Sequence, residues 1–574
     1  MADGADLYIH GADLPTVVQD GRSNVLWDAI TVSEGKITAV GPASDLRALV
    51  GPRTQVVDAA GGALIPGIND AHLHFTVLAS ILYSCIDISA AHCSSWNEVA
   101  QRIRDAAAER PVVVKAHGWD EFRLGPGGPE MLAALGVDVP VVAFDQTGHQ
   151  LLANEKLLRA ASVTASTPDP SGGLIGRRAD GTPNGLFVDA AMELPIRAIP
   201  VPSPEELRRV QVQCQSLLHS WGITSLTEPG LGPGGAGLLD GSPTTGALES
   251  LATLAEADEL ALRINVLMLF AGTGGISSES VRNGLASGLP QLLADRAIDP
   301  LLLRIGGVKV FADGTPRSGT AWMSAPYGTE CSHGQLVVAG TSDEERIAEL
   351  NEIIALVHEA GFQAGVHATG DATTMAVVDA VAAAQQAGPA HRRPGAGGDP
   401  RHYVIHGAFA GAQAPRQLAR MAAHGVGYCT NPLIRFGGGA SLERLLGPER
   451  FAWHQPLASA STAGVKFTAT SDAPVTSADW RGEIIAMVTR TTRDHDFPVH
   501  PAEQITSREA LAAMTSTAAW QDHAETVKGT LSAGQLADLC LMERPWPAEH
   551  EIQDLASNPV RSTWLGGRLV HGTD

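Results

Sequence analysis

Cysteine is sparse in this chain of 574 residues, which contains six. The cysteines stand at positions 85, 93, 214, 331, 429 and 540, and no two of them form a CxxC pair. A disulfide framework or a thiolate zinc site needs paired cysteines at short, regular spacing. The cysteine pattern therefore indicates neither.

Basic residues are also few, with 40 Lys and Arg against 62 Asp and Glu, and the formal net charge is −22. Such a charge argues against a nucleic-acid or anionic-membrane partner. No apolar run reaches the roughly 18 residues of a membrane span. The first residues, MADGADLYIHGADLP, lack both the positive charge and the apolar core of a signal peptide. We therefore expect a soluble, cytoplasmic protein that acts on a small molecule.

Several common catalytic fingerprints are missing as well. No GxSxG elbow, P-loop or dinucleotide-binding motif stands at a credible junction between a strand and a helix. The composition is that of a folded protein, because 44% of the residues are hydrophobic and 18% are charged. Any catalytic activity of this protein must therefore come from residues outside these common motifs.

Metal-binding side chains recur at the ends of apolar, β-branched segments. Five strings show this pattern, in the order PGINDAHLHF, GGVKVFADG, AGVHATGD, YVIHGAF and ATSDAPV, and they supply His72, His74, Lys309, His367, His406 and Asp472. In a strand, residues i and i+2 face the same side, so His72 and His74 can bind one metal ion together. Imidazole and carboxylate ligands suit zinc or a similar cation that activates water. The five strings together predict a metal-dependent hydrolase.

The middle of the chain alternates strands and helices. Eight strands are expected to end near His74, Glu228, Phe270, Phe311, His367, His406, Asn431 and Asp472. Capping boxes mark helix starts at Ser95–Glu98, Ser203–Glu206, Ser342–Glu345 and Thr506–Glu509. This alternation predicts an α/β protein with a TIM-like (β/α)8 barrel, which typically needs only about 250 residues.

The remaining residues predict two additions to the barrel. Both termini show short strands and hairpin signals, such as SEGK in residues 33–36, so residues 1–66 plus 525–574 are expected to form one small β-sandwich. The barrel would occupy residues 67–524 and contain an insertion at 76–202 that follows its first strand and forms a lid. The Gly- and Pro-rich stretches 229–246 and 387–400 favour surface loops or crossovers.

These motifs resemble those of the amidohydrolase superfamily, in particular its YtcJ-like branch, amidohydrolase family 3, which includes N-substituted formamide deformylases. The resemblance covers nearly the whole chain and rests on the HxH of DAHLHF, the string VKVFADG, the string HATGD and the string SDAP. The string GWDE at residues 118–121, within the predicted insertion, also matches a string of this branch. The chain departs from the branch in DQTGH, where relatives have a DGH-like string, in TPRSGTA after the ADG, and in the GAF that follows His406.

The resemblance implies two zinc ions per chain, with manganese, iron and cobalt as alternatives. His72, His74 and Asp472 would hold the more buried ion, and His367 and His406 the more exposed one. A hydroxide that bridges the ions would attack the carbonyl, and Asp472 would transfer its proton to the leaving nitrogen. The expected catalytic residues are Asp472, Lys309 and His406.

Lys309 requires a special form to bind a metal, because an ordinary lysine is protonated. Burial favours the neutral amine, which can react with CO2 to give a carbamate with two oxygen donors. By resemblance, a carboxylated Lys309 would bridge the two ions. Alternatively, its ammonium pairs with Asp313 or Glu228, and the site holds one metal as in the D-aminoacylase relatives.

Substrate contacts are expected from residues near the predicted lid and pocket wall: Phe75, Trp119, His149, Asp313 and Arg317. Ordinary packing is the alternative for Phe75, Trp119 and His149, and a surface or capping role is the alternative for Asp313, Asp371 and Glu228. Asp313, Asp371 and Glu228 are also candidates for orienting the histidines. The aromatic residues Trp119, Phe122 and Phe144 favour an N-alkyl or N-aryl amide.

The sequence therefore predicts hydrolysis of a C–N bond, most specifically in an N-substituted formamide or amide. The alternatives are an N-acyl-amino-acid deacylase, a hydrolase of carbamates or cyclic amides, an esterase, and a scaffold that has lost its activity. A deacylase should hold the substrate carboxylate with an arginine, for which Arg317 and Arg435 are the candidates. The resemblance also allows a homodimer.

Overall fold

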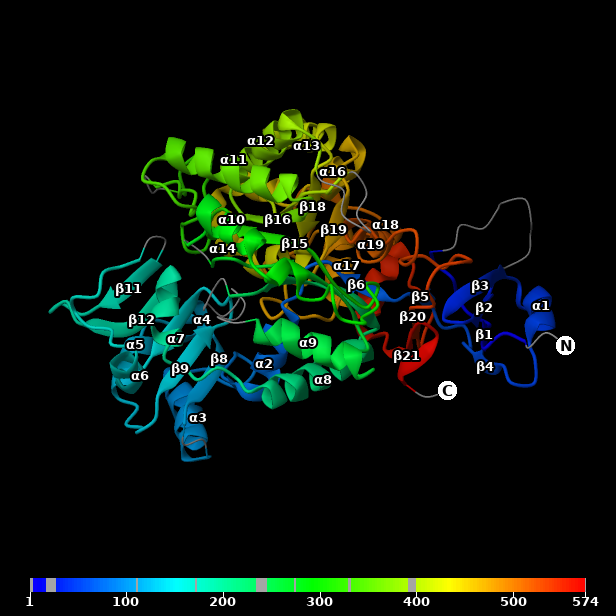
Figure 1. Ribbon diagram of the computed structural model, residues 1–574, viewed down its shortest axis with the longest axis horizontal. Coiled ribbons are helices and arrows are strands. Elements are labelled where there is room, and N and C mark those ends of the chain that lie inside the picture. The colour runs from blue at the N-terminus through cyan, green and yellow to red at the C-terminus, as the bar shows by residue number, and fades with distance from the viewer. Residues whose placement is uncertain are drawn as a thin grey trace.

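Eight parallel strands form one sheet at the centre of the molecule (Figure 1). The computed structural model describes residues 4–16, 27–109, 112–170, 173–233, 245–272, 275–328, 332–390 and 399–572. In sheet order the central strands are β19 (Phe467–Ala469), β18 (Gly427–Thr430), β17 (Tyr403–His406), β16 (Gln363–Ala368), β15 (Leu303–Phe311), β14 (Arg263–Met268), β13 (Ile223–Leu231) and β6 (Ile68–Asp70). Each predicted strand end lies at or within a few residues of an observed one, so the predicted (β/α)8 barrel sheet is confirmed.

The eight-stranded sheet is nearly closed, and its edge strands β19 and β6 are joined by hydrogen bonds between the segments at their carboxyl ends. The backbone N–H of Asp472 donates to the carbonyl of His72 over 3.0 Å, and the Thr470 hydroxyl donates to the same carbonyl over 2.6 Å. The buried carboxylate of Asp70 accepts from the hydroxyl of Ser471 at 2.6 Å. These contacts between residues 70–72 and 470–472, which we call the seam, fix Asp472 beside His72.

Helices surround the central sheet and follow the strands in sequence. They are α2 (Phe75–Ser84), α8 (Pro204–Ser220), α9 (Gly246–Glu256), α10 (Ser278–Ala286), α11 (Asp343–Glu359), α12 (Asp371–Ala387), α13 (Ala414–Ala423), α14 (Pro432–Leu446), α15 (Pro448–Ala452), α16 (Leu457–Ala463), α17 (Arg481–Thr489), α18 (Ser507–Ala513) and α19 (Ser516–Gln521). Their apolar faces and the strands share a large buried core, which includes Val310, Val366 and Val404. Among the described residues, no helix combines the length and apolar character that a membrane span requires.

The predicted helix starts are confirmed by side-chain caps. Ser203 and Ser342 accept hydrogen bonds from the third residue of α8 and α11, and Thr506 forms a complete capping box with Glu509. The Ser95 hydroxyl accepts a longer bond of 3.4 Å at the start of α3 (Trp96–Glu109). These bonds satisfy backbone N–H groups that have no partner inside the helix.

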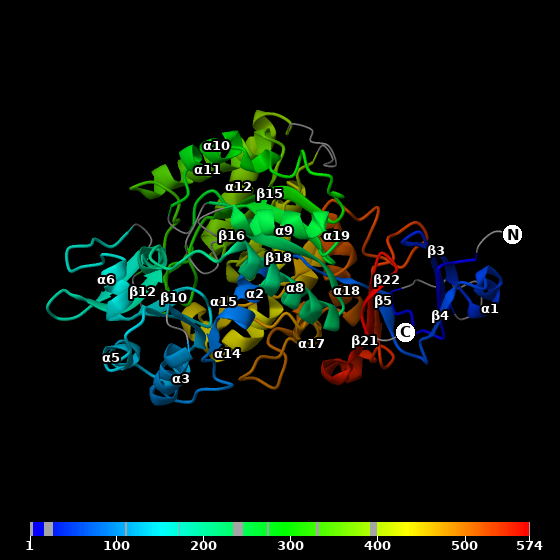
Figure 2. The same ribbon diagram turned by 60° about the horizontal axis from the view of Figure 1, so that its bottom comes forward.

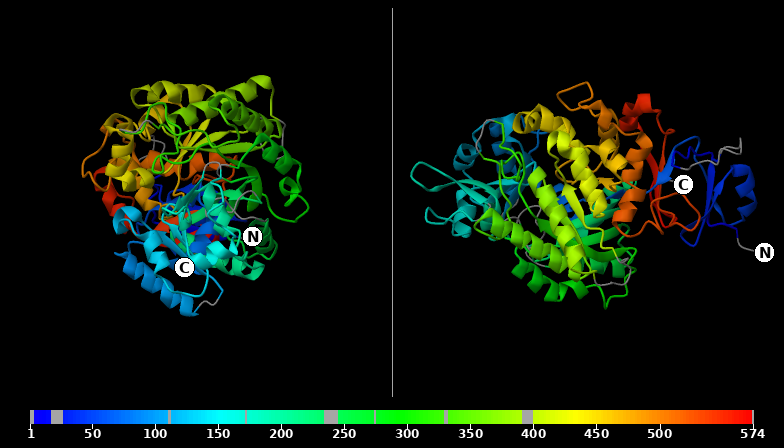
Figure 3. Two further views of the ribbon diagram at one scale, coloured as in Figure 1. Left: turned by 90° about the vertical axis from the view of Figure 1, so that its left-hand side faces the viewer. Right: turned by 90° about the horizontal axis from the view of Figure 1, so that it is seen from above.

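A six-stranded sheet lies between α2 and α8 in sequence, within the predicted insertion. Its order is β11 (Gly173–Arg177), β12 (Pro183–Asp189), β10 (Gln150–Ala153), β9 (Val141–Asp145), β8 (Val114–Trp119) and β7 (Ile86–Asp87). Its helices are α3, α4 (Glu121–Leu124), α5 (Gly128–Ala133), α6 (Glu155–Ala160) and α7 (Glu193–Ile196). This sheet lies at one end of the molecule in every side view (Figures 1 to 3).

Two four-stranded sheets from the chain termini lie at the opposite end (Figures 1 and 2). One has the order β3 (Lys36–Gly41), β2 (Ala29–Ser33), β1 (Leu7–His10) and β4 (Gln55–Asp58), and the other β22 (Arg568–His571), β21 (Val560–Leu565), β20 (Leu539–Met542) and β5 (Leu64–Pro66). Leu7 and Ile9 share a buried cluster with Leu539 and Trp564. The short helix α1 (Ala43–Leu46) lies between β3 and β4 in sequence.

Smaller features complete the fold. The SEGK turn joins β2 to β3 as a hairpin, with Glu34 and Gly35 both at positive φ. Short 3-10 helices span Arg47–Leu49, Ala190–Met192, Leu289–Gln291, Gly411–Gln413, Pro501–Glu503 and Glu549–Ser557. Of the two predicted Gly- and Pro-rich loops, residues 234–244 and 391–398 lie outside the described residues.

A buried pair of histidines makes the fold sensitive to acid. His402 Nδ1 accepts from the backbone N–H of Ala364 at 2.9 Å, and its Nε2 lies 2.9 Å from Nδ1 of His358. Protonation of His402 Nδ1 would break the first of these bonds. Burial, and then the neighbouring His358, lower the pKa of His402 to about 3.

We therefore expect the free energy of unfolding to fall as the pH drops below about 6.5, by about 1.4 kcal/mol per pH unit for this group. Between these two pKa values, His402 binds a proton in the unfolded state but stays neutral in the folded state. The contribution of His402 to the free energy of unfolding is therefore fully present only above about pH 6.5. Denaturant titrations between pH 7.5 and 5 should show a shallower pH slope for His402→Asn. The variant His550→Gln, at an exposed position, should keep the original slope. An unchanged slope in His402→Asn would rule out this source of acid sensitivity.

Candidate metal centre and active site

A cavity of about 830 Å³ opens at the carboxyl ends of the barrel strands. All six predicted metal ligands line it: His72, His74, Lys309, His367, His406 and Asp472. The six-stranded insertion sheet contributes another part of its wall through residues such as Asp120, His149 and Asp189. The carboxyl ends of barrel strands are where enzymes of this architecture place their chemistry.

His72, His74 and Asp472 form the most compact part of the candidate site. Oδ1 of Asp472 lies 3.3 Å from Nε2 of both histidines. Both histidines follow the end of β6 instead of lying within it, so a turn, and not the alternation of a strand, brings their rings together. The two ring centroids are 5.2 Å apart and nearly perpendicular. One ligand atom from each of the three residues lies within 4.8 Å of the others, close enough to share a metal ion.

Burial and neighbouring charges set the protonation of this group. Burial is the main cause of the lowered pKa values of His72 and His74, and the charge of Lys309 lowers both further. Burial alone would raise the pKa of Asp472, but the adjacent His72 and His74 hold it well below its usual range. Neutral imidazoles and an ionised carboxylate are the forms that bind metal ions.

His367 and His406 lie next to each other, with ring centroids 4.6 Å apart, and the ring of His72 is 5.9 Å from that of His406. His406 Nδ1 donates to Oδ1 of Asn431 at 2.6 Å, which leaves its Nε2 as an acceptor. His367 Nε2 donates to the carbonyl of Gly314 at 2.9 Å. Such outer contacts fix the orientation of histidines that bind metals.

Lys309 comes from β15 and is almost fully buried, with 1% of its surface exposed. Its Nζ lies 4.7 Å from the ring centroid of Phe311. Its charge contributes to the lowered pKa values of His72, His74, His367 and His406, after the larger effect of burial. The side chain therefore lies among the predicted ligands.

These residues fit a divalent metal ion. Neither ring nitrogen of the fully buried His72 makes a hydrogen bond within the described part of the chain. A buried polar atom without such a bond is costly unless something else binds it. Four imidazoles and one carboxylate also match the donors that zinc and related ions prefer.

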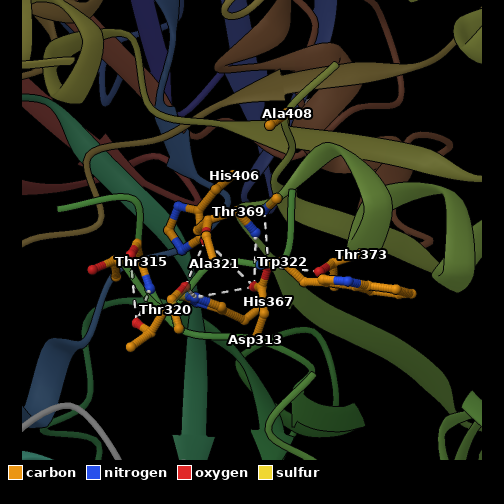
Figure 4. Close-up of polar contacts among 12 residues, drawn as sticks. Asp313, Thr315, Thr320, Ala321, Trp322, His367, Thr369, Thr373, His406 and Ala408 are labelled. Atoms are coloured by element: carbon orange, nitrogen blue, oxygen red, sulfur yellow. Dashed lines mark hydrogen bonds and ion pairs between the residues drawn. The ribbon is translucent and has the colours of Figure 1, made fainter. Parts of the chain in front are cut away.

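Asp313 was predicted to contact substrate, but the structure gives it another position. Its carboxylate accepts hydrogen bonds from the backbone N–H groups of Thr369 at 2.9 Å and Gly370 at 2.8 Å, and from the hydroxyl of Thr373 at 2.6 Å (Figure 4). It does not line the cavity. Oδ1 of Asp313 lies 3.9 Å from Nε2 of His367, so Asp313 supports the segment that follows this histidine.

Phe75 and Trp119 also differ from the predicted substrate contacts. Phe75 is fully buried in the barrel core, and the indole N–H of Trp119 donates to the carbonyl of Ala143 at 2.8 Å. Neither residue lines the cavity. Phe75 packs in the core of the barrel, and Trp119 packs in a buried cluster of the insertion. Glu228, with its pKa raised by burial to about 8, accepts from the N–H of Thr76 and supports α2.

His149 and Arg317 do line the cavity. Arg317 donates to Asp120 at 2.9 Å, and its guanidinium lies 4.4 Å from the ring centroid of Phe122. His149 Nδ1 lies 2.8 Å from Oδ1 of Asp189. These two residues remain candidates for substrate contact.

Sequence reasoning did not identify several residues that shape the site. Asp70 stands two residues before His72, and this proximity was the available signal for its role in the seam. The sequence analysis predicts Asn431 only as the end of a strand, and it assigns no role to Asp189. Their partners lie 25 and 40 residues away in sequence, a separation that no local pattern reveals.

Comparison with known proteins agrees with this picture. Residues 55–571 match the model of the amidohydrolase family. The chain is 25% identical to the N-substituted formamide deformylase of Arthrobacter pascens, over 99% of each protein, and 24% identical to the putative amidohydrolase YtcJ of Bacillus subtilis, over 98% of each. A crystal structure of an uncharacterized metal-dependent hydrolase from Pyrococcus horikoshii has the same fold, with a TM-score of 0.70 and 20% identity over 94% of this chain and 97% of that one.

The family match covers both the terminal strands from β4 onward and the whole barrel, and it includes every predicted metal ligand. The resemblance deduced from the HxH, VKVFADG, HATGD and SDAP strings is thereby confirmed. The chain belongs to the amidohydrolase family.

Proposed function

We propose that this protein is a metal-dependent hydrolase that cleaves the C–N bond of a small amide with an apolar substituent, and that N-substituted formamides are its most specific substrate class. The observation behind this proposal is the group of four histidines, one aspartate and one lysine at the base of a cavity of about 830 Å³. The similarity to a formamide deformylase supports the same class.

His72, His74 and Asp472 would hold one zinc ion and His367 and His406 a second, and a carboxylated Lys309 would be a ligand of both. When bound, such ions supply an acidified water and a Lewis acid that polarises a carbonyl. Asp472 is the one carboxylate of the group, so it can accept a proton from the attacking water and return it to the leaving nitrogen. Asn431 keeps the ring of His406 oriented during these steps.

The wall of the cavity favours an apolar substituent. Helix α14 presents Leu433, Ile434, Phe436, Leu442 and Leu445 to it, and Phe122 adds an aromatic ring from the insertion. The helix bends at Gly439, whose φ of 35° and ψ of −122° depart from helical values. A side chain there would collide with the carboxylate of Asp494. Much of the apolar character thus comes from α14 and Phe122, with further apolar contacts from Met192, Phe311 and Val475, whereas Trp119 and Phe144 do not line the cavity.

A second candidate is the deacylation of N-acyl amino acids, and the cavity-lining Arg317 is the observation that favours it. The carboxylate of Asp120 already pairs with this arginine at 2.9 Å, so a substrate carboxylate would have to compete with it. Arg435 lies outside the cavity and donates to the carbonyls of Arg490 and Val499. The deacylase therefore ranks below the formamide hydrolase.

The test is a substrate panel with zinc-loaded protein: N-benzylformamide, N-acetylphenylalanine, a benzyl carbamate, a cyclic amide and benzyl formate. We expect the largest kcat/KM for N-benzylformamide among the C–N substrates. Removal of metal with a chelator should lower turnover by at least about a hundredfold, because the acidified water is lost, and added zinc should restore it.

Turnover that survives complete metal removal would contradict the metal-dependent mechanism. A preference for N-acetylphenylalanine would favour the second candidate, and this preference should then fall in Arg317→Leu. A zinc-loaded protein that hydrolyses none of the panel would leave the inactive scaffold as the better explanation.

A further inference from the structure

The insertion places an imidazole in the same cavity as the candidate metal ligands. His149 lies in the turn between β9 and β10 and is one of the cavity-lining residues, with 19% of its side chain exposed. His74, His367 and His406 line the same cavity. A substrate in this cavity can therefore contact His149 as well as the candidate ligands.

Asp189 holds His149 at two points. Its carboxylate lies 2.8 Å from Nδ1 of the ring, and its backbone N–H donates to the carbonyl of His149 at 2.9 Å. A carboxylate is an acceptor only, so we assign the ring proton to Nδ1. In the neutral ring, Nε2 is then an acceptor of hydrogen bonds.

The backbone at Asp189 is strained. Its φ of 48° and ψ of −127° lie outside the regions that L residues favour. Positive φ also occurs at His406, with 69°, and at Asp472, with 55°. Strain of this kind persists where surrounding contacts enforce it, and it is concentrated at functional sites. Positive φ occurs at four non-glycine residues that line this cavity: Asp189, His406, Gln455 and Asp472.

The turn that presents His149 is itself fixed. The buried carboxylate of Asp145 accepts from the Thr147 hydroxyl and, over 3.0 Å, from the N–H of Gln150. The N–H of Gln146 donates to the carbonyl of Trp119 at 3.0 Å. The ring is thus held by its turn as well as by Asp189, which reduces the entropy cost of a contact with substrate.

We propose that His149 is a specificity-determining residue that accepts a hydrogen bond from the N–H of the substrate amide, and that Asp189 is its positioning residue. The inference rests on the proposed function and narrows it to secondary amides, R–CO–NH–R′. A tertiary amide has no N–H to donate, and an ester has an oxygen in its place.

The test compares N-benzylformamide, N-benzyl-N-methylformamide and benzyl formate with zinc-loaded wild type and His149→Leu. We expect kcat/KM to fall at least about tenfold for the secondary amide, the size of one lost hydrogen bond, and to stay within about threefold for the other two. His149→Gln, which keeps an acceptor oxygen, should recover part of the loss. Asp189→Asn should reduce the preference for the secondary amide, whereas a merely structural fault would affect all three probes equally. His92→Leu replaces an exposed histidine of the insertion that pairs with Asp87 and does not line the cavity, and it should leave the ratios unchanged.

A binding measurement separates this inference from the proposed hydrolysis. N-Benzylmethanesulfonamide has an N–H and resists hydrolysis, and its N-methyl derivative lacks the N–H. Calorimetry should show that wild type prefers the first compound and that His149→Leu does not. This result in a protein that hydrolyses none of the amides would reject the proposed function and leave the recognition role intact. Equal preference in wild type and His149→Leu, or an equal loss of kcat/KM for all three substrates, would overturn the role of His149.

Discussion

Replacing Asp472 with asparagine is expected to lower kcat for the preferred amide by a factor of about 10² to 10⁴, the range for loss of a general acid–base group. The side chain keeps its shape but can no longer take a proton from water and pass it to the leaving nitrogen. In the structure, Oδ1 of Asp472 lies 3.3 Å from both His72 and His74, and the backbone N–H is bonded to the carbonyl of His72. Steady-state kinetics at saturating substrate would measure this loss.

Asp371→Asn is the matched control, because it also removes a buried carboxylate at the end of a barrel strand. Asp371 accepts from the N–H and the hydroxyl of Ser324 and does not line the cavity. We expect this variant to lose stability but to keep kcat within about threefold, since surface and supporting changes away from the chemistry act mainly on folding. Circular dichroism should show that both variants are folded. Wild-type kcat in Asp472→Asn would exclude Asp472 as the proton carrier.

The barrel was predictable because each of its strands has a recognisable local sequence pattern. Each is an apolar, β-branched run with a polar residue at or near its end, and the helices between them begin at Ser or Thr caps. A parallel sheet must gather the carboxyl ends of its strands at one face, so strings hundreds of residues apart could be assigned to one site. The same reasoning explains why His72 and Asp472 were expected to meet.

The walls of the site were less predictable. Trp119 and Phe75 are large and close in sequence to the expected lid and ligands, but sequence proximity does not say which face a side chain occupies. Helix α14 contains three consecutive glycines at 437–439, which weaken any helical pattern, although it supplies much of the apolar wall. The long-range pair of His149 and Asp189 depends on how β10 and β12 align in the insertion sheet, and this register has no local signature.

Lys309 connects the fold to the number of metal ions. Its strand, β15, lies between β14 and β16, and the neighbouring Val308 and Val310 are fully buried. An ammonium among His72, His74, His367 and His406 would repel a metal ion, whereas a carbamate would attract one. Carboxylation joins the amine nitrogen to CO2 and releases one proton, and it starts from the neutral amine that burial favours. The predicted second metal therefore depends on this modification.

Lys309→Ala is expected to lower the metal content from about two ions per chain to about one, with a large loss of kcat, because in two-metal sites both ions act on the reacting oxygens. Elemental analysis of protein prepared with and without bicarbonate would measure the content. Millimolar formate or acetate should partly restore the activity of the alanine variant by replacing the missing carboxylate, and Lys309→Glu should retain more metal than Lys309→Ala. Two ions in Lys309→Ala would contradict the bridge, and a single ion in both the wild type and the variant would favour a mononuclear site built on His72, His74 and Asp472.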